Sequence, residues 1–263
     1  MTMVSDAKLG ELAARREERY CSKLREMGVD HFDERGELPD EYRQLLRELV
    51  RVQVDVEGVL LFHDWIRPWL DVAPTPRDRM RIGRLHAEEL VHGYQFLKMY
   101  KSIDHELTAE DFADEEARKA QYIFNYAFDT WVDIALLNTL ADRMGAFVFA
   151  DMEECSYLPW RRITGRIAKD ERGHTALGFG NLREICETEE GRAEAQQLLY
   201  KWYPASLDMF GRTDSDRQWD YLDWGLKKST NEELRRSFVA QVDPLIESLG
   251  LEVPPYEYNR RFL

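Results

Sequence analysis

Residues 166–179 read RIAKDERGHTALGF, and residues 85–97 read LHAEELVHGYQFL. Each stretch holds a glutamate that is followed three positions later by a histidine. The two pairs are Glu171 with His174 and Glu89 with His92. On an α-helix, residues i and i+3 lie on one face, so each pair can direct a carboxylate and an imidazole to the same point. The pattern indicates two helices that contribute ligands to one site.

Each Glu-x-x-His pair has an acidic residue about one helical hairpin upstream. Glu57 precedes Glu89 by 32 positions, and Asp142 precedes Glu171 by 29. A helix of roughly fifteen to twenty residues, a turn and the return helix use about that much chain. One acid from each of two helices, with a Glu-x-x-His from each of two others, is the two-metal ligand set of ferritin-like bundles. The spacing predicts an all-α protein, a ferritin-like four-helix bundle core with additional N- and C-terminal helices.

Ion pairs on a helix surface would produce the same spacing, because glutamate is common in an acidic helical chain. The surroundings favour a buried site, since apolar residues lie on several sides of both Glu-x-x-His helices. A buried unpaired carboxylate is costly, and metal coordination is one of the few ways to hold several of them together. Spacing by itself leaves both interpretations open.

The first upstream acid has a rival in Asp55, two positions before Glu57. Residues i and i+2 point about 200° apart on a helix, so one of the two can face the site. Glu57 falls inside an apolar stripe and Asp55 points away from it. The stripe consists of Val50, Val54, Leu61 and Trp65. We therefore prefer Glu57, whose longer side chain can also bridge two ions.

The second upstream acid, Asp142, has rivals in Asp133 and Glu153. Asp133 gives a less suitable interval of 38 residues to Glu171. The choice of Asp142 makes one ligand arm shorter than the other three carboxylates. A shorter arm leaves room for dioxygen, water or substrate.

The chain of 263 residues is near the upper size for a single hydrophobic core, and no stretch has the composition of a linker. We expect one ferritin-like di-iron oxygenase domain over residues 1–263, with an N-terminal helix in 1–36, the metal-binding bundle in 37–187 and C-terminal helices and a tail in 188–263. Periodicity and capping signals predict helices near 5–27, 39–68, 77–101, 116–150, 157–187, 190–203, 217–228 and 231–248.

Composition restricts the class of protein. With 44% hydrophobic residues and no apolar run near eighteen residues, the chain can build a large core without spanning a membrane. The N-terminal twenty residues contain no apolar signal region, and three cysteines without metal-ligand spacing indicate reduced thiols. We expect a cytoplasmic protein. A net charge of −14 argues against nucleic acid as a partner, although Lys227 and Lys228 could bind the phosphates of a small ligand.

Several longer stretches resemble a known family. They are residues 38–58 (LPDEYRQLLRELVRVQVDVEG), 122–147 (YIFNYAFDTWVDIALLNTLADRMGAF), 155–174 (CSYLPWRRITGRIAKDERGH), 202–216 (WYPASLDMFGRTDSD) and 226–254 (LKKSTNEELRRSFVAQVDPLIESLGLEVP). Together they resemble the catalytic subunits of the bacterial phenylacetyl-CoA 1,2-epoxidases, of the phenylacetic acid catabolic protein family. The resemblance covers about residues 37 to 255.

The resemblance implies a multicomponent di-iron monooxygenase that activates O₂ and epoxidises or hydroxylates the ring of an aryl-CoA thioester. Electrons would come from NAD(P)H through a separate reductase, and a related metal-free bundle subunit would complete a hetero-oligomer. Carried over by position, the family's iron ligands fall on the residues that spacing selects: Glu57, Glu89, His92, Asp142, Glu171 and His174. Lys227 and Lys228 would then bind CoA phosphates.

Two other functions fit the same ligands. One is a paralogous di-iron oxygenase that acts on another acyl-CoA or small substrate, and the other is a ferritin-like ferroxidase. A ferroxidase would not need residues 190–255, with their Trp, Tyr and Lys content. Aromatic residues near the proposed ligands could line a substrate pocket, although such positions are core packing more often than substrate contacts. They are Phe124, Tyr126, Trp131 and Phe147.

Overall fold

The structure is a computed structural model that describes residues 6–62, 67–103, 122–213 and 215–262, with the side chains of residues 6, 57–62, 122 and 124 outside the description. Within these ranges the secondary structure is helical, and the single pairing of strand type is a parallel bridge between Phe32 and Tyr157. The all-α class predicted from the sequence is confirmed, and it is consistent with a ferritin-like bundle that carries extra terminal helices.

The chain divides into two compact units. The first comprises Met1–Glu37 with Ala135–Leu263, and the second is Leu38–Ile134. Helix α7 (Trp131–Asp151) begins in the second unit and continues in the first. The other helices of the first unit are α1 (Asp6–Arg19), α2 (Ser22–Met27), η3 (Met152–Glu154), α8 (Leu158–Ile185), α9 (Glu189–Asp208), α10 (Asp216–Asp223) and α11 (Asn231–Ser248). Those of the second unit are α3 (Asp40–Phe62), α4 (Arg67–Val72), α5 (Pro76–Ile103) and η2 (Tyr122–Asn125).

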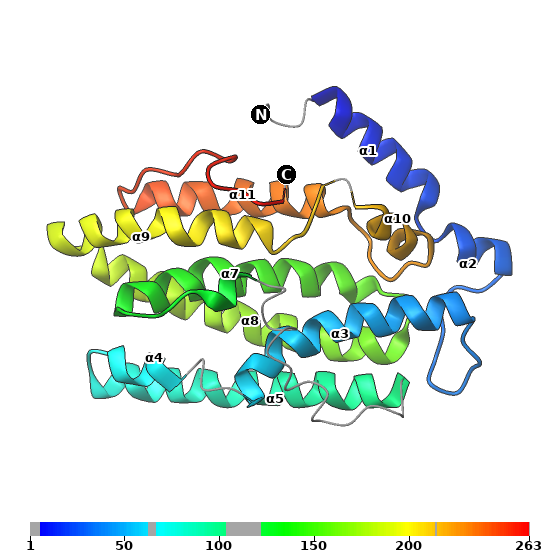
Figure 1. Cartoon of the computed structure of the whole chain (residues 1–263), viewed down its shortest axis with the longest axis horizontal. Helices are drawn as coiled ribbons and strands as arrows, with labels where there is room; N and C mark the ends of the chain where they lie inside the picture. Colours follow the sequence, from blue (N-terminus) through cyan, green and yellow to red (C-terminus); the bar gives the residue numbers. More distant parts are fainter. Residues whose placement is uncertain (1–5, 63–66, 104–121, 214, 263) are drawn as a thin grey trace. The chain divides into compact units, whose positions relative to one another are not determined.

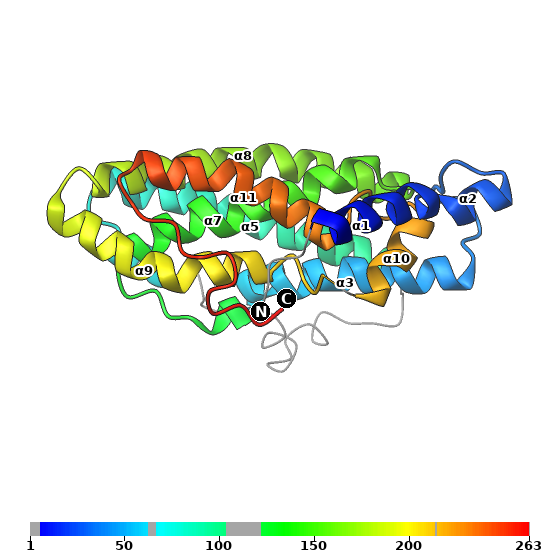
Figure 2. The same ribbon diagram turned by 90° about the horizontal axis from the view of Figure 1, so that it is seen from above.

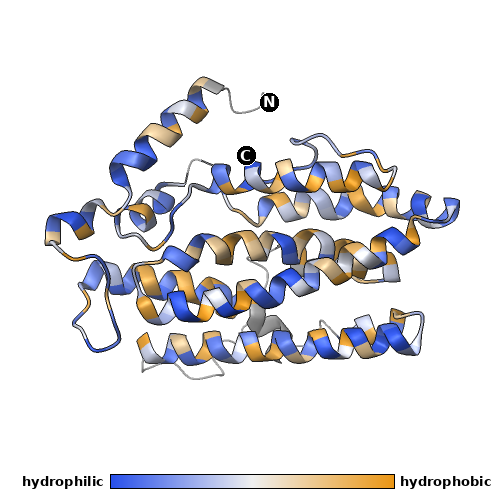
Figure 3. Cartoon of the chain, turned by 180° about the vertical axis from the view of Figure 1, so that it is seen from behind, coloured by the Kyte–Doolittle hydropathy of each residue, from blue (hydrophilic) through white to orange (hydrophobic). Residues whose placement is uncertain are grey.

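Helices α3 and α5 of the second unit lie side by side and run in opposite directions (Figures 1 and 2). Hydrophilic and hydrophobic residues alternate along α5 with a helical period (Figure 3). The pair is held by buried apolar side chains, among them Leu46, Val50 and Val54 of α3 and Leu85 and Phe96 of α5. The amide of Asp78 donates to Thr75 Oγ1 at 3.2 Å, which confirms the predicted N-cap before Pro76.

Helices α7 and α8 of the first unit run in opposite directions and are joined by residues 152–157 (Figure 1). They approach most closely at Gly178. A Cβ atom built on Gly178 would lie 2.6 Å from Asn138 Cβ and 2.6 Å from the Thr139 amide nitrogen. Glycine is required at this position because any side chain would push the backbones of the two helices apart.

The C-terminal helices end the first unit. Thr230 and Glu233 form the predicted capping box at the start of α11, whose bounds agree with the prediction. Gly250 follows α11 with φ of 73°, in the left-handed region that ends helices. Asp208, at the end of α9, accepts a hydrogen bond at 2.6 Å from Arg260 Nε, and both side chains are fully buried. This ion pair anchors the C-terminal segment to α9.

Three predicted helices differ from the observed ones. The helix predicted over 5–27 is interrupted at Cys21, whose φ of 58° is incompatible with helical hydrogen bonding, so α1 and α2 are separate. The helix predicted over 116–150 is wrong in its described first part, because η2 and a loop precede the start of α7 at Trp131. Of the helix predicted over 39–68, α3 covers the part up to Phe62.

Length and apolar character together decide whether a helix can cross a bilayer. Among the helices of the described ranges, none has enough of both.

Candidate metal centre

The first unit brings three predicted ligands together. Asp142 of α7 and Glu171 and His174 of α8 each offer a ligand atom, and these atoms lie within 4.8 Å of one another. Glu171 is 4% exposed and His174 is 3% exposed, whereas Asp142 is half-buried. His174 Nδ1 lies 3.8 Å from Glu171 Oε2, as expected for residues i and i+3 on one helix face. Two carboxylates and an imidazole therefore converge on one point.

Gly145, one turn after Asp142 on α7, keeps space open beside Glu171. A Cβ atom built on Gly145 would lie 3.8 Å from Glu171 Oε2, which is ordinary contact distance. A larger side chain at this position would reach the carboxylate itself. Helix α7 therefore supplies both a ligand and a gap next to the facing ligand.

The second unit places the other Glu-x-x-His pair on α5. His92 Nδ1 lies 3.3 Å from Glu89 Oε2, and the two residues are 1% and 5% exposed. A carboxylate and an imidazole buried together on one helix face repeat the arrangement of Glu171 and His174. The i, i+3 geometry that the sequence predicts is thus present on both helices.

The remaining predicted ligand, Glu57, belongs to α3, and its side chain lies outside the described side chains. Its rival Asp55 is engaged with Arg51, whose Nε lies 2.6 Å from Asp55 Oδ1. An i, i+4 ion pair of this kind is the structural role that an acidic residue on a helix commonly has. The preference for Glu57 over Asp55 stays a prediction.

The two rivals of Asp142 occupy other positions. Asp133 is buried, and its Oδ2 accepts from the amides of Asp129 and Thr130, each at 3.1 Å, at the start of α7. This carboxylate satisfies amides that a helix N-terminus leaves without intrahelical partners. Glu153 is exposed in η3. Neither is part of the cluster at Asp142.

The donor set fits a divalent metal ion. Carboxylates held this close repel each other when both are ionised, and burial of Glu171 reduces the solvation that would offset the repulsion. A cation between the donors removes this cost. Carboxylate oxygens with imidazole nitrogens suit iron, manganese or zinc, and they do not select among these metals by themselves.

Two polar residues next to the predicted ligands were not singled out by the sequence. Asn138 is fully buried, and its Nδ2 donates to Asp142 Oδ2 at 2.7 Å. His86 precedes Glu89 by one helical turn and packs against Trp69, with ring centroids 5.4 Å apart. Both stand three or four positions before a proposed ligand, and that spacing is the signal that could have found them.

Burial keeps His86 neutral. The side chain is 8% exposed, and desolvation lowers the pKa of its imidazole to about 4, against a smaller opposing effect of Glu89. Among the described residues, Nε2 of His86 has no hydrogen-bond partner. The α5 pair therefore has an uncharged imidazole beside it at neutral pH.

The predicted phosphate contacts lie beside acidic residues. Lys227 Nζ donates to Asn231 Oδ1 at 3.2 Å, and burial lowers the pKa of Lys227. The amide of Lys228 donates to Asp151 Oδ2 at 3.0 Å, and Lys228 Nζ donates to Glu154 Oε1 at 2.5 Å. Binding of CoA phosphates by these two lysines stays a prediction, and it would have to compete with these neighbours.

Of the aromatic candidates for a substrate pocket, Phe147 packs edge-on against Phe238, with ring centroids 6.0 Å apart. This contact is within the core of the first unit. Tyr126 and Trp131 are partly buried, and the side chain of Phe124 lies outside the described ones.

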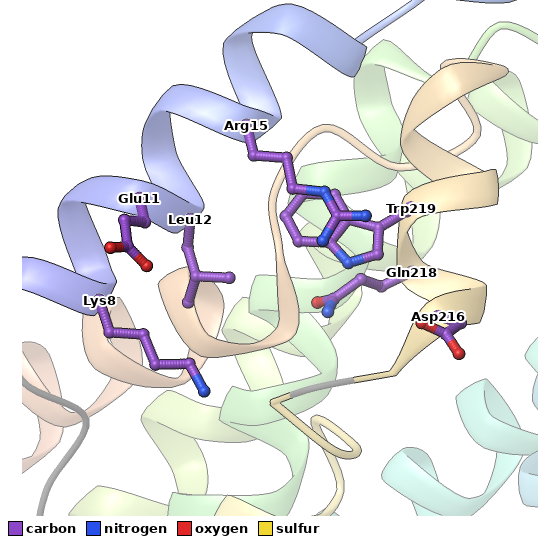
Figure 4. Close-up of a pocket in the computed structure, with 7 residues that line it drawn as sticks. All are labelled: Lys8, Glu11, Leu12, Arg15, Asp216, Gln218 and Trp219. Carbon is purple, nitrogen blue, oxygen red and sulfur yellow. The ribbon is translucent and has the colours of Figure 1, made fainter.

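A separate hollow of about 240 Å³ adjoins α1 and α10 (Figure 4). Its lining includes Lys8, Glu11, Leu12, Arg15, Asp216, Gln218 and Trp219. The Arg15 guanidinium stacks 4.1 Å from the centre of the Trp219 ring. Opposite charges alternate around this hollow, and it holds no histidine or cysteine among its described lining residues, so it does not compete with the cluster at Asp142 as a metal site.

Known proteins resemble the chain over most of its length. The phenylacetic acid catabolic protein family matches residues 27–261. One relative is 1,2-phenylacetyl-CoA epoxidase from Escherichia coli (strain K12), whose A chain is 31% identical over 232 residues, which cover 82% of this chain and 71% of that protein. Benzoyl-CoA oxygenase component B from Aromatoleum evansii is 24% identical over 226 residues, and the chain spans 47% of its length.

Proposed function

The chain belongs to the phenylacetic acid catabolic protein family, and we propose that it is the metal-binding subunit of a di-iron oxygenase that acts on an aryl-CoA thioester. The observation that carries the proposal is the convergence of Asp142, Glu171 and His174 within 4.8 Å. The equivalent Glu-x-x-His pair on α5 supports it. The two relatives are named as an epoxidase and an oxygenase of aryl-CoA thioesters.

In this proposal six residues hold the two iron ions: Glu57, Glu89, His92, Asp142, Glu171 and His174. When bound, the iron would supply O₂ activation, so that one oxygen atom enters the aromatic ring and the other leaves as water at the expense of two electrons and two protons. We place the source of the electrons in NAD(P)H, delivered through a separate reductase.

The protein's own contribution is to position and to shield. Burial of both Glu-x-x-His pairs excludes bulk water from the donors. The i, i+3 spacing fixes each carboxylate relative to its imidazole without a loop that would have to become ordered. Asp142 reaches less far than a glutamate, and Gly145 lacks a side chain, so α7 leaves space on its side of Glu171 for O₂ or the substrate ring.

The partners follow from the same family membership. The names of the two relatives, one from Escherichia coli and one from Aromatoleum evansii, describe each as one part of a larger enzyme. We propose a hetero-oligomer with a related metal-free bundle subunit, together with a reductase, in the cytoplasm. The net charge of −14 is unfavourable for nucleic acid, which has no part in the proposal.

A second candidate function is the same chemistry on a different acyl group. It is favoured by the names of the relatives, which specify two different thioesters, phenylacetyl-CoA and benzoyl-CoA. A ferroxidase that uses the same ligands would oxidise iron without regard to any thioester.

A single-turnover experiment separates the three functions. The metal-free protein is loaded anaerobically with two equivalents of Fe(II) and exposed to ¹⁸O₂ in the presence of phenylacetyl-CoA, of benzoyl-CoA or of neither. Incorporation of one ¹⁸O atom into phenylacetyl-CoA supports the proposed function, and incorporation into benzoyl-CoA alone supports the second candidate. Iron oxidation at the same rate with and without thioester, and no labelled product, contradicts both and indicates a ferroxidase.

A further inference from the structure

Asn138 is an amide side chain at a position where packing favours an apolar residue. It lies in the middle of α7 and is fully buried, with Leu137 and Leu140 buried close by in the same helix. Within the described part of the chain, its Oδ1 has no hydrogen-bond partner. A buried acceptor without a partner destabilises the folded state by about 1 to 3 kcal/mol.

The amide has one contact that offsets this cost. Its Nδ2 donates to Asp142 Oδ2 at 2.7 Å, a short bond between residues i and i+4 of the helix. A hydrogen bond to an ionised carboxylate is stronger than one between neutral groups, and burial of the donor strengthens it further. The side chain of Asn138 is thus directed toward one of the proposed iron ligands.

The facing helix holds Asn138 in place. A Cβ atom on Gly178 would lie 2.6 Å from Asn138 Cβ, so the backbone of α8 passes directly over this side chain. Gly178 is one turn beyond His174, another proposed ligand, on the same face of α8. The contact therefore connects the orientation of the amide to the helix that supplies Glu171 and His174.

We propose that Asn138 is a positioning residue for the metal centre, an inference that rests on the proposed function. By holding Oδ2, its amide restricts rotation of the Asp142 carboxylate and directs the other oxygen, Oδ1, toward the metal. Asp142 then binds through a single oxygen. A carboxylate restrained in this way binds metal more tightly than one that must lose rotational freedom on binding.

The test compares matched variants by anaerobic titration with Co(II) as the probe, with visible absorption as the readout. Asn138→Leu removes the donor and keeps a similar shape. Asn138→Ser is a smaller second change, whose hydroxyl bonds to the preceding turn of the helix and does not reach Asp142. Asn181→Leu is the control, because Asn181 is a buried amide of α8 whose Nδ2 has no hydrogen-bond partner among the described residues. Asp142→Ala tests the ligand itself.

We expect both Asn138 variants to bind Co(II) ten- to a hundredfold more weakly at the site that contains Asp142, with an altered visible spectrum. Asn181→Leu should bind like wild type. The thermal midpoint of metal-free Asn138→Leu should be equal to that of wild type or higher, because the unpaired acceptor is removed. A purely structural role would instead lower that midpoint and leave the spectrum unchanged.

The outcomes separate this inference from the proposed function. If Asp142→Ala loses Co(II) binding while Asn138→Leu and Asn138→Ser keep the affinity and spectrum of wild type, the positioning role is wrong and the metal site stands. If wild type binds no Co(II), or Asp142→Ala binds as wild type does, the proposed site is wrong and the role of Asn138 falls with it.

Discussion

Glu89 and its neighbour Glu88 show how one position on a helix changes the role of a carboxylate. Glu89 is buried beside His92, whereas Glu88 is more exposed and pairs with Arg84, whose Nε lies 3.0 Å from Glu88 Oε1. Surface pairs of this kind contribute about 0.5 kcal/mol or less. The two residues therefore offer a matched comparison of a proposed ligand with a surface acid.

We predict that Glu89→Ala and His174→Ala each lower the bound iron from two equivalents per chain and abolish turnover of the thioester. The physical reason is the loss of one donor atom from a site in which each ion has few protein ligands. The measurement is iron content after anaerobic loading, with far-UV circular dichroism to check the helices. Glu88→Ala is the control and should keep both ions. Full iron content in Glu89→Ala would remove that residue from the site.

The neutral state of His86 predicts how the stability of the metal-free protein depends on pH. Its pKa is about 4 in the folded protein, below the value of about 6.5 expected in the unfolded chain. Between these two values the unfolded state binds more protons. The contribution of His86 is therefore fully present above pH 6.5, decreases as the pH falls toward 4 and is constant below that.

We expect His86→Leu to flatten the pH dependence of the free energy of unfolding between pH 6.5 and 4. Urea denaturation of metal-free protein at pH 7.5, 5.5 and 4.5 measures it. His31 is exposed, so His31→Leu should keep the wild-type slope. Equal slopes in wild type and His86→Leu would show that His86 is not a buried neutral imidazole.

At the scale of the helices, local chemistry accounts for what could be predicted. Thr75 before Pro76 and Thr230 with Glu233 are caps whose hydrogen bonds form within four residues, so the starts of α5 and α11 are legible from the sequence. The Glu-x-x-His geometry is equally local. It is present on α5 and α8 because i and i+3 share a face in any helix.

The missed features depend on contacts between distant segments. The left-handed Cys21 interrupts the first helix where its amide donates to Leu222 O at 2.9 Å, and a cysteine gives no sign of such a conformation. The close approach at Gly178 depends on a residue of α7, forty positions earlier. The convergence of Asp142 with Glu171 was predicted from a loop-length argument, and the choice of Glu57 remains untested.

Gly178 gives a prediction for the contact between α7 and α8. In Gly178→Ala the new Cβ atom would meet Asn138 Cβ and the Thr139 amide at 2.6 Å, and backbone must move to relieve the clash. We expect a loss of about 1 to 3 kcal/mol in the free energy of unfolding. Gly180→Ala is the control on the same helix, because nothing lies within 4 Å of its added Cβ atom. It should be neutral or stabilising by up to about 1 kcal/mol. Similar losses in both variants would contradict the close packing at Gly178.

At the scale of the whole chain, ion pairs of two kinds join segments of the first unit that are distant in sequence. Arg162 and Glu34 are half exposed or more, with Arg162 Nη2 3.4 Å from Glu34 Oε2. Arg260 and Asp208 have no exposed surface at all. Solvent screens the first pair, so its contribution is small. The second pair has lost its water, and each partner depends on the other for compensation.

Removal of one partner should therefore have unequal effects. Arg260→Ala takes the guanidinium away from Asp208, which stays buried and keeps the amides of Arg261 and Phe262 as donors at 2.7 and 3.2 Å. We expect a loss of about 3 kcal/mol in the free energy of unfolding. Glu34→Ala should cost about 0.5 kcal/mol or less. Urea denaturation at neutral pH measures both. A small loss in Arg260→Ala, equal to that in Glu34→Ala, would mean that the C-terminal segment detaches from α9 and that water reaches Asp208.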